Sequence, residues 1–405
     1  MSRSWSAGRA GRAARGAAIA MAVLGACAAA GADAVAAPAT AYVSTHAVAH
    51  AADTNCASAA FATIQAAVTA SPAGATVVVC TGAYRGTVTV TTPLTLVGEG
   101  AVLQAAGSGP AVTVRSSGVT LRGLIVTGAT GEGILVEGTV KAPLTRVTVV
   151  DNLVLGNDRG NPKGSALTSS PYTPCDAQNG APGDCGEGIH LTGTADSLVS
   201  GNTLADNDGG ILLSDEGGPV AHDQVVHNVV VDNNFASGIS LVGRSGAALA
   251  LNAPAPSAGG VFANTVADNT VNANGTGGDG SGILLLAQGT GDGVYANRVQ
   301  DNLVALNSLA GIAVEGLAAA QDLSGNVVTG NTIDFNGQGA VLKFGSTSDP
   351  NPTGLLVASA NKITLAVTRN SFVNNVCGVW ATSTVTLTGM ATDRFTGVAQ
   401  DEATG

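Results

Sequence analysis

The stretch VQDNLVALN at residues 299–307 decides the fold. It begins with Val299, places Asn302 three residues later, and continues with Val304 and Asn307. The same arrangement of Val, Asn, an apolar residue and Asn occurs seven times, beginning at Val149, Val199, Val225, Val266, Val299, Val328 and Val367. Copies separated by 26 to 50 residues indicate one supersecondary unit that stacks on itself, and not a globular core.

A Gly followed by a β-forming residue recurs after these motifs. Such pairs are Gly188-Ile189, Gly210-Ile211, Gly238-Ile239, Gly282-Ile283, Gly311-Ile312 and Gly378-Val379. Parallel strands usually need helical crossovers, yet no helical period lies between these strands. A coil that stacks each strand on the equivalent strand of the next turn satisfies both observations, and this is a parallel β-helix. We expect Val149 and Val154 to point inward, and the motif asparagines to occupy turns where their amides bond between coils.

The N-terminal part predicts a capping helix followed by strands. Phe61, Ile64 and Val68 share one face of a helix over residues 59–70, and Ser71-Pro72 ends it. Strand-like runs follow at residues 76–80, 87–90, 94–97, 111–114, 119–126 and 134–137. These runs are too close together for helices to lie between them.

The segments FATIQAAV (residues 61–68), GAY (82–84) and LTLVG (94–98) resemble the N-terminal part of pectin-lyase-like proteins, the right-handed parallel β-helix superfamily. The resemblance implies an all-β, right-handed parallel β-helix solenoid with an N-terminal capping helix. We divide the chain into a signal peptide (1–37), an N-terminal linker (38–58), the parallel β-helix (59–390) and a C-terminal tail (391–405). This fold carries lyases, hydrolases, esterases, epimerases and non-enzymatic surface proteins, so the resemblance does not name an activity.

Composition excludes several classes of protein. Only 11% of the 405 residues are charged and 45% are hydrophobic, which excludes a disordered chain. The net charge of −11 is spread along the chain, which argues against nucleic-acid binding. An acidic substrate would therefore need local cations or a bound metal. We expect a monomer.

The first 37 residues predict export. Four arginines precede an apolar stretch over residues 17–26, and Ala34-Val35-Ala36 is typical of a cleavage site. The apolar stretch is too short to span a membrane, so we expect a secreted protein with no membrane span. Leu24-Gly25-Ala26-Cys27 also resembles a bacterial lipobox, which leaves a lipid anchor at Cys27 as an alternative.

The remaining cysteines would lie in an oxidising compartment. A bridge between Cys56 and Cys80 would hold the N-terminal cap, and one between Cys175 and Cys185 would order a loop. We expect Cys377 to be a buried thiol.

Ionisable residues that could carry chemistry are concentrated between Asp184 and Arg244. This stretch lies near two predicted insertions, at residues 159–186 and 244–260. A third insertion is predicted at residues 346–360. Insertions in a solenoid often project from the binding face. We predict catalytic roles for His190, Asp215, Glu216 and Arg244, and a possible Ca²⁺ site at Asp208, Asp215 and Glu216.

These residues suit an enzyme acting on polysaccharide, and we expect a lyase or epimerase of uronic-acid-containing glycans. Proton abstraction beside a carboxylate needs a base, here His190, and a cation such as Arg244 or Ca²⁺. A hydrolytic variant would pair Asp208 with Asp215 or Glu216. The alternative is a non-catalytic surface or glycan-binding module, and a third hypothesis is a metal-maturation role.

The position after each Gly-Ile pair should point outward from its strand. These residues are Leu135, His190, Leu212, Ser240, Leu284, Ala313, Leu342 and Trp380. Most are apolar, so either other parts of the chain cover them or they form a binding surface. Because His190 is predicted to point outward, its substitution is expected to cost within about 0.5 kcal/mol.

Overall fold

The computed structural model describes residues 39–48, 52–157, 186–244, 259–276, 280–337, 343–344, 347–348 and 353–405. The chain divides into two units, residues 1–37 and 38–405, and every described residue lies in the second. The predicted signal peptide, Cys27 and the Cys175–Cys185 pair lie outside the described residues.

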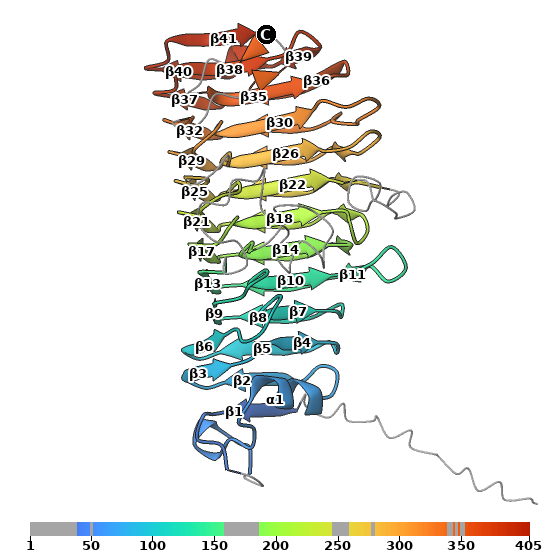
Figure 1. The fold of residues 1–405 in the computed structure, drawn as a ribbon, viewed down its shortest axis with the longest axis vertical. Helices are drawn as coiled ribbons and strands as arrows, with labels where there is room; N and C mark the ends of the chain where they lie inside the picture. Colours follow the sequence, from blue (N-terminus) through green and yellow to red (C-terminus); the bar gives the residue numbers. More distant parts are fainter. Residues whose placement is uncertain are drawn as a thin grey trace, which may run out of the picture. The chain divides into compact units, whose positions relative to one another are not determined.

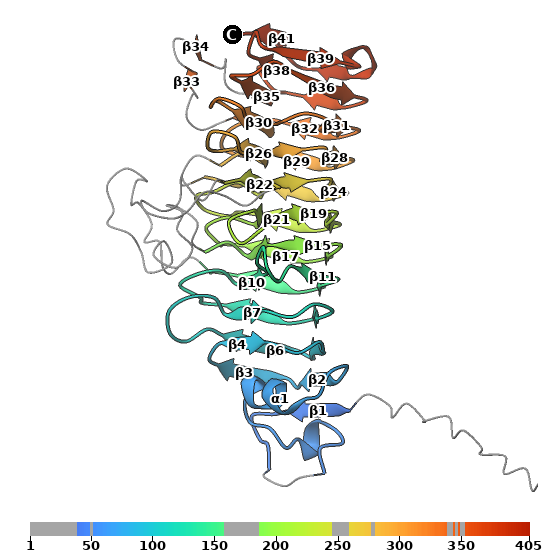
Figure 2. The same cartoon turned by 90° about the vertical axis from the view of Figure 1, so that its right-hand side faces the viewer.

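The second unit is a stack of coils that follow one another in sequence order from β1 to β41 (Figures 1 and 2). Three long parallel sheets run through the stack. The first sheet contains β1 (Thr40–Val43), β2 (Thr76–Val79), β5 (Thr95–Gly98), β8 (Thr120–Arg122), β12 (Thr148–Val150), β16 (Leu198–Ser200), β20 (Gln224–Val226), β24 (Thr265–Ala267), β28 (Arg298–Gln300), β31 (Val327–Thr329), β36 (Ile363–Thr368) and β39 (Val385–Thr388).

The second sheet contains β3 (Gly82–Arg85), β6 (Ala101–Gln104), β9 (Ile125–Thr127), β13 (Leu153–Leu155), β17 (Thr203–Ala205), β21 (Val229–Val231), β25 (Thr270–Asn272), β29 (Leu303–Ala305), β32 (Thr332–Asp334), β37 (Ser371–Val373) and β40 (Arg394–Thr396). The third sheet contains β4 (Val88–Val90), β7 (Val112–Val114), β10 (Ile134–Glu137), β14 (Ile189–Thr192), β18 (Ile211–Ser214), β22 (Ile239–Gly243), β26 (Ile283–Ala287), β30 (Ile312–Gly316), β35 (Thr353–Ser359), β38 (Cys377–Ala381) and β41 (Gln400–Thr404).

A fourth, shorter parallel sheet contains β11 (Leu144–Thr145), β15 (Thr194–Ala195), β19 (Val220–Ala221), β23 (Val261–Phe262) and β27 (Val294–Tyr295). The remaining elements are α1 (Ile64–Ala70), the antiparallel pair β33 (Lys343–Phe344) and β34 (Thr347–Ser348), and two 3₁₀ turns (Cys56–Ser58 and Met390–Thr392). This arrangement confirms the predicted right-handed parallel β-helix with an N-terminal helix.

The repeat motif places apolar side chains in layers inside the coils. Val149 pairs with Val199, and Val199 with Val225, and all three are buried. Val154 and its equivalents form the next layer. Both predicted inward layers are therefore confirmed.

The motif asparagines form two buried ladders along the turns. Asn269 is typical: its Oδ1 accepts from the backbone N–H of Asn228, and its own N–H donates to Oδ1 of Asn302 at 3.0 Å. Its Nδ2 also donates to Asn302 Oδ1 and to the carbonyl of Val225. The predicted bonding of amides between coils is confirmed.

A third ladder was not predicted. It contains Asp223, Asn264, Asn297 and Asn326, and each backbone N–H in the first three positions donates to the next side chain. These residues stand five positions before the first Asn of a motif, so the same spacing, extended towards the N-terminus, would have revealed them.

The Gly that directly precedes β10, β14, β18, β22, β26 and β30 of the third sheet has a steric cause. A Cβ at Gly188 would lie 2.5 Å from Leu204 Cδ2, inside the packed core. A side chain there would force the coil apart.

Several predicted boundaries are wrong. The helix begins at Ile64 and not at residue 59, because Thr63 caps it and Phe61 pairs with the backbone of Tyr42. Residues 119–126 form two strands, β8 and β9, because Gly123 turns the chain with a φ of 69°.

The stack is also longer than predicted. β1 lies in the predicted linker and pairs with β2, while β40 and β41 lie in the predicted tail and continue their sheets. The predicted insertion at residues 346–360 contains β35, a buried strand of the third sheet. The Cys56–Cys80 disulfide is confirmed, and Cys377 is buried as predicted.

Candidate functional site

His190 lies on the outer side of the third sheet, as its register predicts. Ile189 and Leu191 flank it in β14 and belong to the apolar core. His190 itself is only 1% exposed, although it points away from that core. The expectation that its substitution costs little is therefore wrong, because a buried polar side chain depends on its partners.

Three side chains surround the His190 imidazole, and together with it they form what we call the His190 cluster: Glu132, His190, Ser214 and Glu216. Nδ1 lies 3.3 Å from Glu132 Oε1. Nε2 lies 2.7 Å from Ser214 Oγ and 2.9 Å from Glu216 Oε1. Both ring nitrogens therefore have polar partners, and the two carboxylates would stabilise the imidazolium that forms when His190 takes up a proton.

Successive coils position these groups. Glu132 precedes β10, His190 lies within β14, and Ser214 ends β18, where it pairs with Thr192. These three strands are neighbours in the third sheet, which Figure 1 shows with β10, β14 and β18 stacked in order. Glu216 follows two residues after Ser214.

The electrostatic surroundings keep Glu216 ionised. Burial would raise the pKa of Glu216, but attraction to His190 and Arg244, with hydrogen bonds from His190 and Ser214, lowers it to about 2. Glu216 is therefore a carboxylate at any physiological pH. Its neighbours are the imidazole of His190 and the cationic side chain of Arg244.

Asp215 connects the ends of two strands. Its Oδ1 accepts a hydrogen bond of 2.6 Å from the backbone N–H of Arg244, which follows β22. Both residues are buried. The structure thus brings the predicted residues His190, Asp215, Glu216 and Arg244 into one region.

The predicted Ca²⁺ site is not assembled. Asp208 precedes β18 and Asp215 follows it, so the strand separates them. Among the described residues no group of three or more His, Cys, Asp or Glu side chains is placed to hold a metal ion. The same separation removes the predicted acid–base pairing of Asp208 with Asp215 or Glu216.

Most of the outward apolar residues of the third sheet are covered, and Leu284 is half-buried. Leu135, Leu212, Ala313 and Trp380 are all buried. Leu356 of β35 lies in the stripe between Ala313 and Trp380, and the predicted Leu342 lies outside the described residues. Towards the C-terminal end the stripe forms a second apolar cluster, against which Ala403 packs.

Sequence reasoning missed Glu132 and Ser214. A usable signal exists for Glu132, because the sequence GEGI occurs at residues 131–134 and again at 186–189. Both acidic residues of this repeat, Glu132 and Glu187, are buried. A serine at a strand end carries no comparable signal.

Asp223 is a second unusual acid, at the first position of the third ladder. Burial raises its pKa to about 6, despite hydrogen bonds from Thr194 Oγ1 and the backbone N–H of Ser197 that lower it. It stands where the following coils carry a neutral Asn. Its role is structural.

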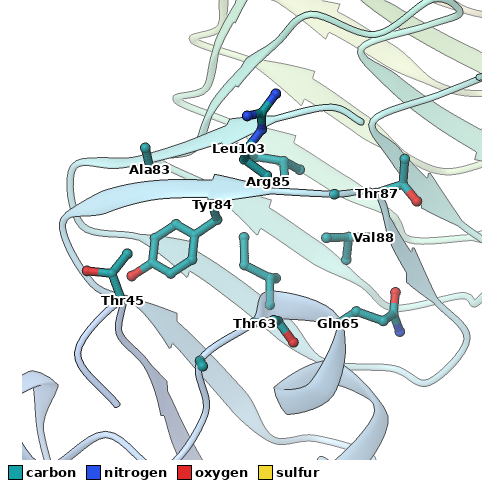
Figure 3. Close-up of a pocket in the computed structure, with 12 residues that line it drawn as sticks. Thr45, Thr63, Gln65, Ala83, Tyr84, Arg85, Thr87, Val88 and Leu103 are labelled. Carbon is teal, nitrogen blue, oxygen red and sulfur yellow. The ribbon is translucent and has the colours of Figure 1, made fainter. Parts of the chain in front are cut away.

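A separate cavity of about 250 Å³ lies at the N-terminal end, beside α1 and β3 (Figure 3). The fold uses its polar groups: Gln65 bonds the backbone of Thr89 in both directions, and Tyr84 Oη lies 2.8 Å from the carbonyl oxygen of Cys80. Burial raises the pKa of Tyr84, so it is a neutral phenol. The residues that line this cavity include none of the His190 cluster.

These observations define a parallel β-helix protein with a buried acid–histidine cluster on one face. A family model described as periplasmic copper-binding protein (NosD) matches residues 176–311, which include His190 and Arg244. The match covers less than half of the chain. No curated protein matches it in sequence.

Three solved structures of similar fold are distant from this chain in sequence. The A-module of mannuronan C-5 epimerase AlgE6 from Azotobacter vinelandii is 17% identical with a TM-score of 0.49, over 84% of this chain and 90% of that one. Alginate lyase from Paenibacillus sp. str. FPU-7 is 12% identical with a TM-score of 0.44, over 84% and 95%. GH136 lacto-N-biosidase from Eubacterium ramulus is 11% identical with a TM-score of 0.49, over 90% and 67%. These likenesses concern the fold alone.

Within the part of the chain that the structure describes, no helix is long and apolar enough to cross a membrane.

Proposed function

We propose that this is an exported polysaccharide-active protein whose His190 cluster moves a proton beside the carboxylate of a uronic-acid polymer, by elimination or epimerisation. The observation that carries the proposal is the imidazole of His190, held between two carboxylates next to Arg244 on the outer face of the stack. Buried titratable groups with strong mutual effects are typical of functional sites.

Each residue has a separate role in this chemistry. His190 carries the proton, and Glu132 at Nδ1 fixes the orientation of the ring. Glu216 stabilises the imidazolium. Arg244 supplies the positive charge that the enolate needs as it forms, and Asp215 positions the Arg244 backbone.

The alternative is a glycan-binding module without turnover. The burial of Glu132, His190 and Ser214 favours it, because a buried polar network can serve only to fix a structure. Copper binding, as described for the NosD family, has less support here, since residues 176–311 contain three His, one Cys and no Met.

The test is a screen of alginate, pectate and glycosaminoglycans for unsaturated or epimerised products. His190→Asn should lower the rate by at least about 100-fold. The matched control is His227→Asn, since His227 is exposed and its φ of 59° suits Asn. Binding that is unchanged in His190→Asn, without product from either protein, would favour the module.

A further inference from the structure

Ser214 is the one member of the His190 cluster that has no role in the proposed elimination or epimerisation. Its Oγ lies 2.7 Å from His190 Nε2, while His190 Nδ1 lies 3.3 Å from Glu132 Oε1. A hydroxyl and a carboxylate thus occupy opposite nitrogens of one imidazole. Nucleophile, base and orienting acid stand in the same relation in serine hydrolases of unrelated folds.

We infer that Ser214, His190 and Glu132 form an acyl-transfer site that removes ester-linked acyl groups, such as O-acetyl, from a hydroxylated substrate. This activity goes beyond the proposed elimination or epimerisation. It needs an ester on the substrate and no uronate carboxylate.

Ser214 lies on the outer side of β18, at a position where packing does not require a hydroxyl group. Ile211 and Leu213 of β18 belong to the core, so Leu212 and Ser214 share the outer side with His190 of the neighbouring coil. At the same register the next coil carries Val242. Since an apolar residue fits this position, packing does not require the hydroxyl.

The surroundings also suit the charges that acyl transfer creates. Ser214, His190 and Glu132 are all at most 1% exposed, and a dry site strengthens their hydrogen bonds. Glu216, at 2.9 Å from Nε2, would stabilise the imidazolium that forms. Arg244, which attracts Glu216, is the cation available to a developing oxyanion.

The reaction is a balanced hydrolysis. Ser214 Oγ attacks the ester carbonyl carbon while His190 Nε2 takes the hydroxyl proton. The carbon–oxygen bond to the alcohol breaks, and His190 returns the proton to the leaving oxygen. Water then attacks the acyl-serine, giving one proton to His190 and releasing the carboxylic acid, and His190 reprotonates Ser214.

A fluorophosphonate probe tests this inference without knowledge of the substrate, because it modifies activated serines. Mass spectrometry of the intact full-length protein should show one adduct, on the peptide containing Ser214. Ser214→Ala should abolish that adduct, and His190→Asn should slow labelling by at least about 100-fold. The matched control is Ser240→Ala, since Ser240 is also outward and buried on β22 and should leave labelling unchanged.

Glu132 is a positioning residue in this scheme, and Glu132→Gln separates that role from a structural one. Glu132 and Glu216 are the acids that face His190, with Arg244 behind Glu216. Removing one negative charge should slow labelling and move the midpoint of its pH–rate curve to lower pH. Melting temperatures show which variants remain folded, and hydrolysis of p-nitrophenyl acetate provides a second readout.

Three results would overturn the inference: no adduct on the wild type, an adduct at another residue, or undiminished labelling of Ser214→Ala at the same peptide. Labelling at Ser214 without reaction on uronic-acid polymers would support acyl transfer and count against elimination. Reaction on those polymers without labelling would reject acyl transfer alone.

Discussion

Single asparagines hold neighbouring coils together at the residue scale. Each ladder Asn satisfies backbone groups of both adjacent coils while its own amide is buried. A buried polar group left without a partner costs about 1–3 kcal/mol. The ladders therefore make stability depend on side chains that lie far from any chemistry.

Asn269→Leu should lower the free energy of unfolding by about 3 kcal/mol or more, because the N–H groups of Asn228 and the carbonyl of Val225 lose their partners. Chemical denaturation measures the change. An unfolding free energy equal to that of the wild type would show that the ladder contributes nothing.

His190→Leu should be destabilising by about 3 kcal/mol, because the buried carboxyl groups of Glu132 and Glu216 would lose their imidazole partner. His46→Leu serves as the control, since His46 is exposed, and it should change stability by at most about 0.5 kcal/mol. A neutral effect of His190→Leu would mean that the cluster is open to water.

Asp223→Asn should stabilise the protein at neutral pH. Burial raises the pKa of Asp223 from 3.8 to about 6, so the folded state holds a proton that the unfolded state releases between these values. Stability linked to this group is present below pH 3.8 and is lost as the pH rises through about 6. Asn keeps a neutral side chain and should gain about 1–3 kcal/mol at pH 7.5.

Thermal melts of wild type and Asp223→Asn across this pH range test the prediction. The difference between their melting temperatures should grow from pH 4 to about pH 7. A constant difference would assign the effect to packing and not to the proton.

At the element scale, the strands are too short to be stable alone. Most contain three to five residues, and each depends on its neighbours in the adjacent coils. Among the described residues no coil precedes β1, and α1, the Thr63 cap and the Cys56–Cys80 disulfide lie at this end of the stack. Its stability should therefore be separable from that of the middle of the stack.

Reducing the disulfide should loosen only this end. A bridge across 24 residues contributes about 3 kcal/mol by loop-closure entropy. Hydrogen exchange should accelerate in β1 and β2 on reduction and stay unchanged in β26, because repeats contact only adjacent repeats. Uniform acceleration along the stack would show that it unfolds as a single unit.

At the scale of the whole molecule, the fold was predictable because one motif recurs along the sequence with the same internal spacing. Val149 and Asn152 recur with the same spacing in later coils, and spacing alone places one in the core and the other at a turn. The ends of the stack were not predicted, because β1 and β41 lie outside the copies of the Val-Asn-apolar-Asn motif. Their partners lie on the neighbouring coil.

The candidate site was predictable only in part. The coil register correctly gathered His190, Glu216 and Arg244. Glu132 was missed because it lies 58 residues before His190, across an insertion that hides the stacking. The burial of His190 was also missed, since a repeat pattern defines the inside of a coil and says nothing about what covers its outside.

Exchange of the uronate C5 proton with solvent tests the central claim most directly, because elimination and epimerisation both begin by moving that proton. Alginate, pectate or a glycosaminoglycan incubated with the protein in D₂O would be examined by NMR for deuterium at C5. We predict deuterium in product or recovered substrate with wild type and His227→Asn, and its loss with His190→Asn. No exchange on any of these polymers, or undiminished exchange with His190→Asn, would contradict the claim.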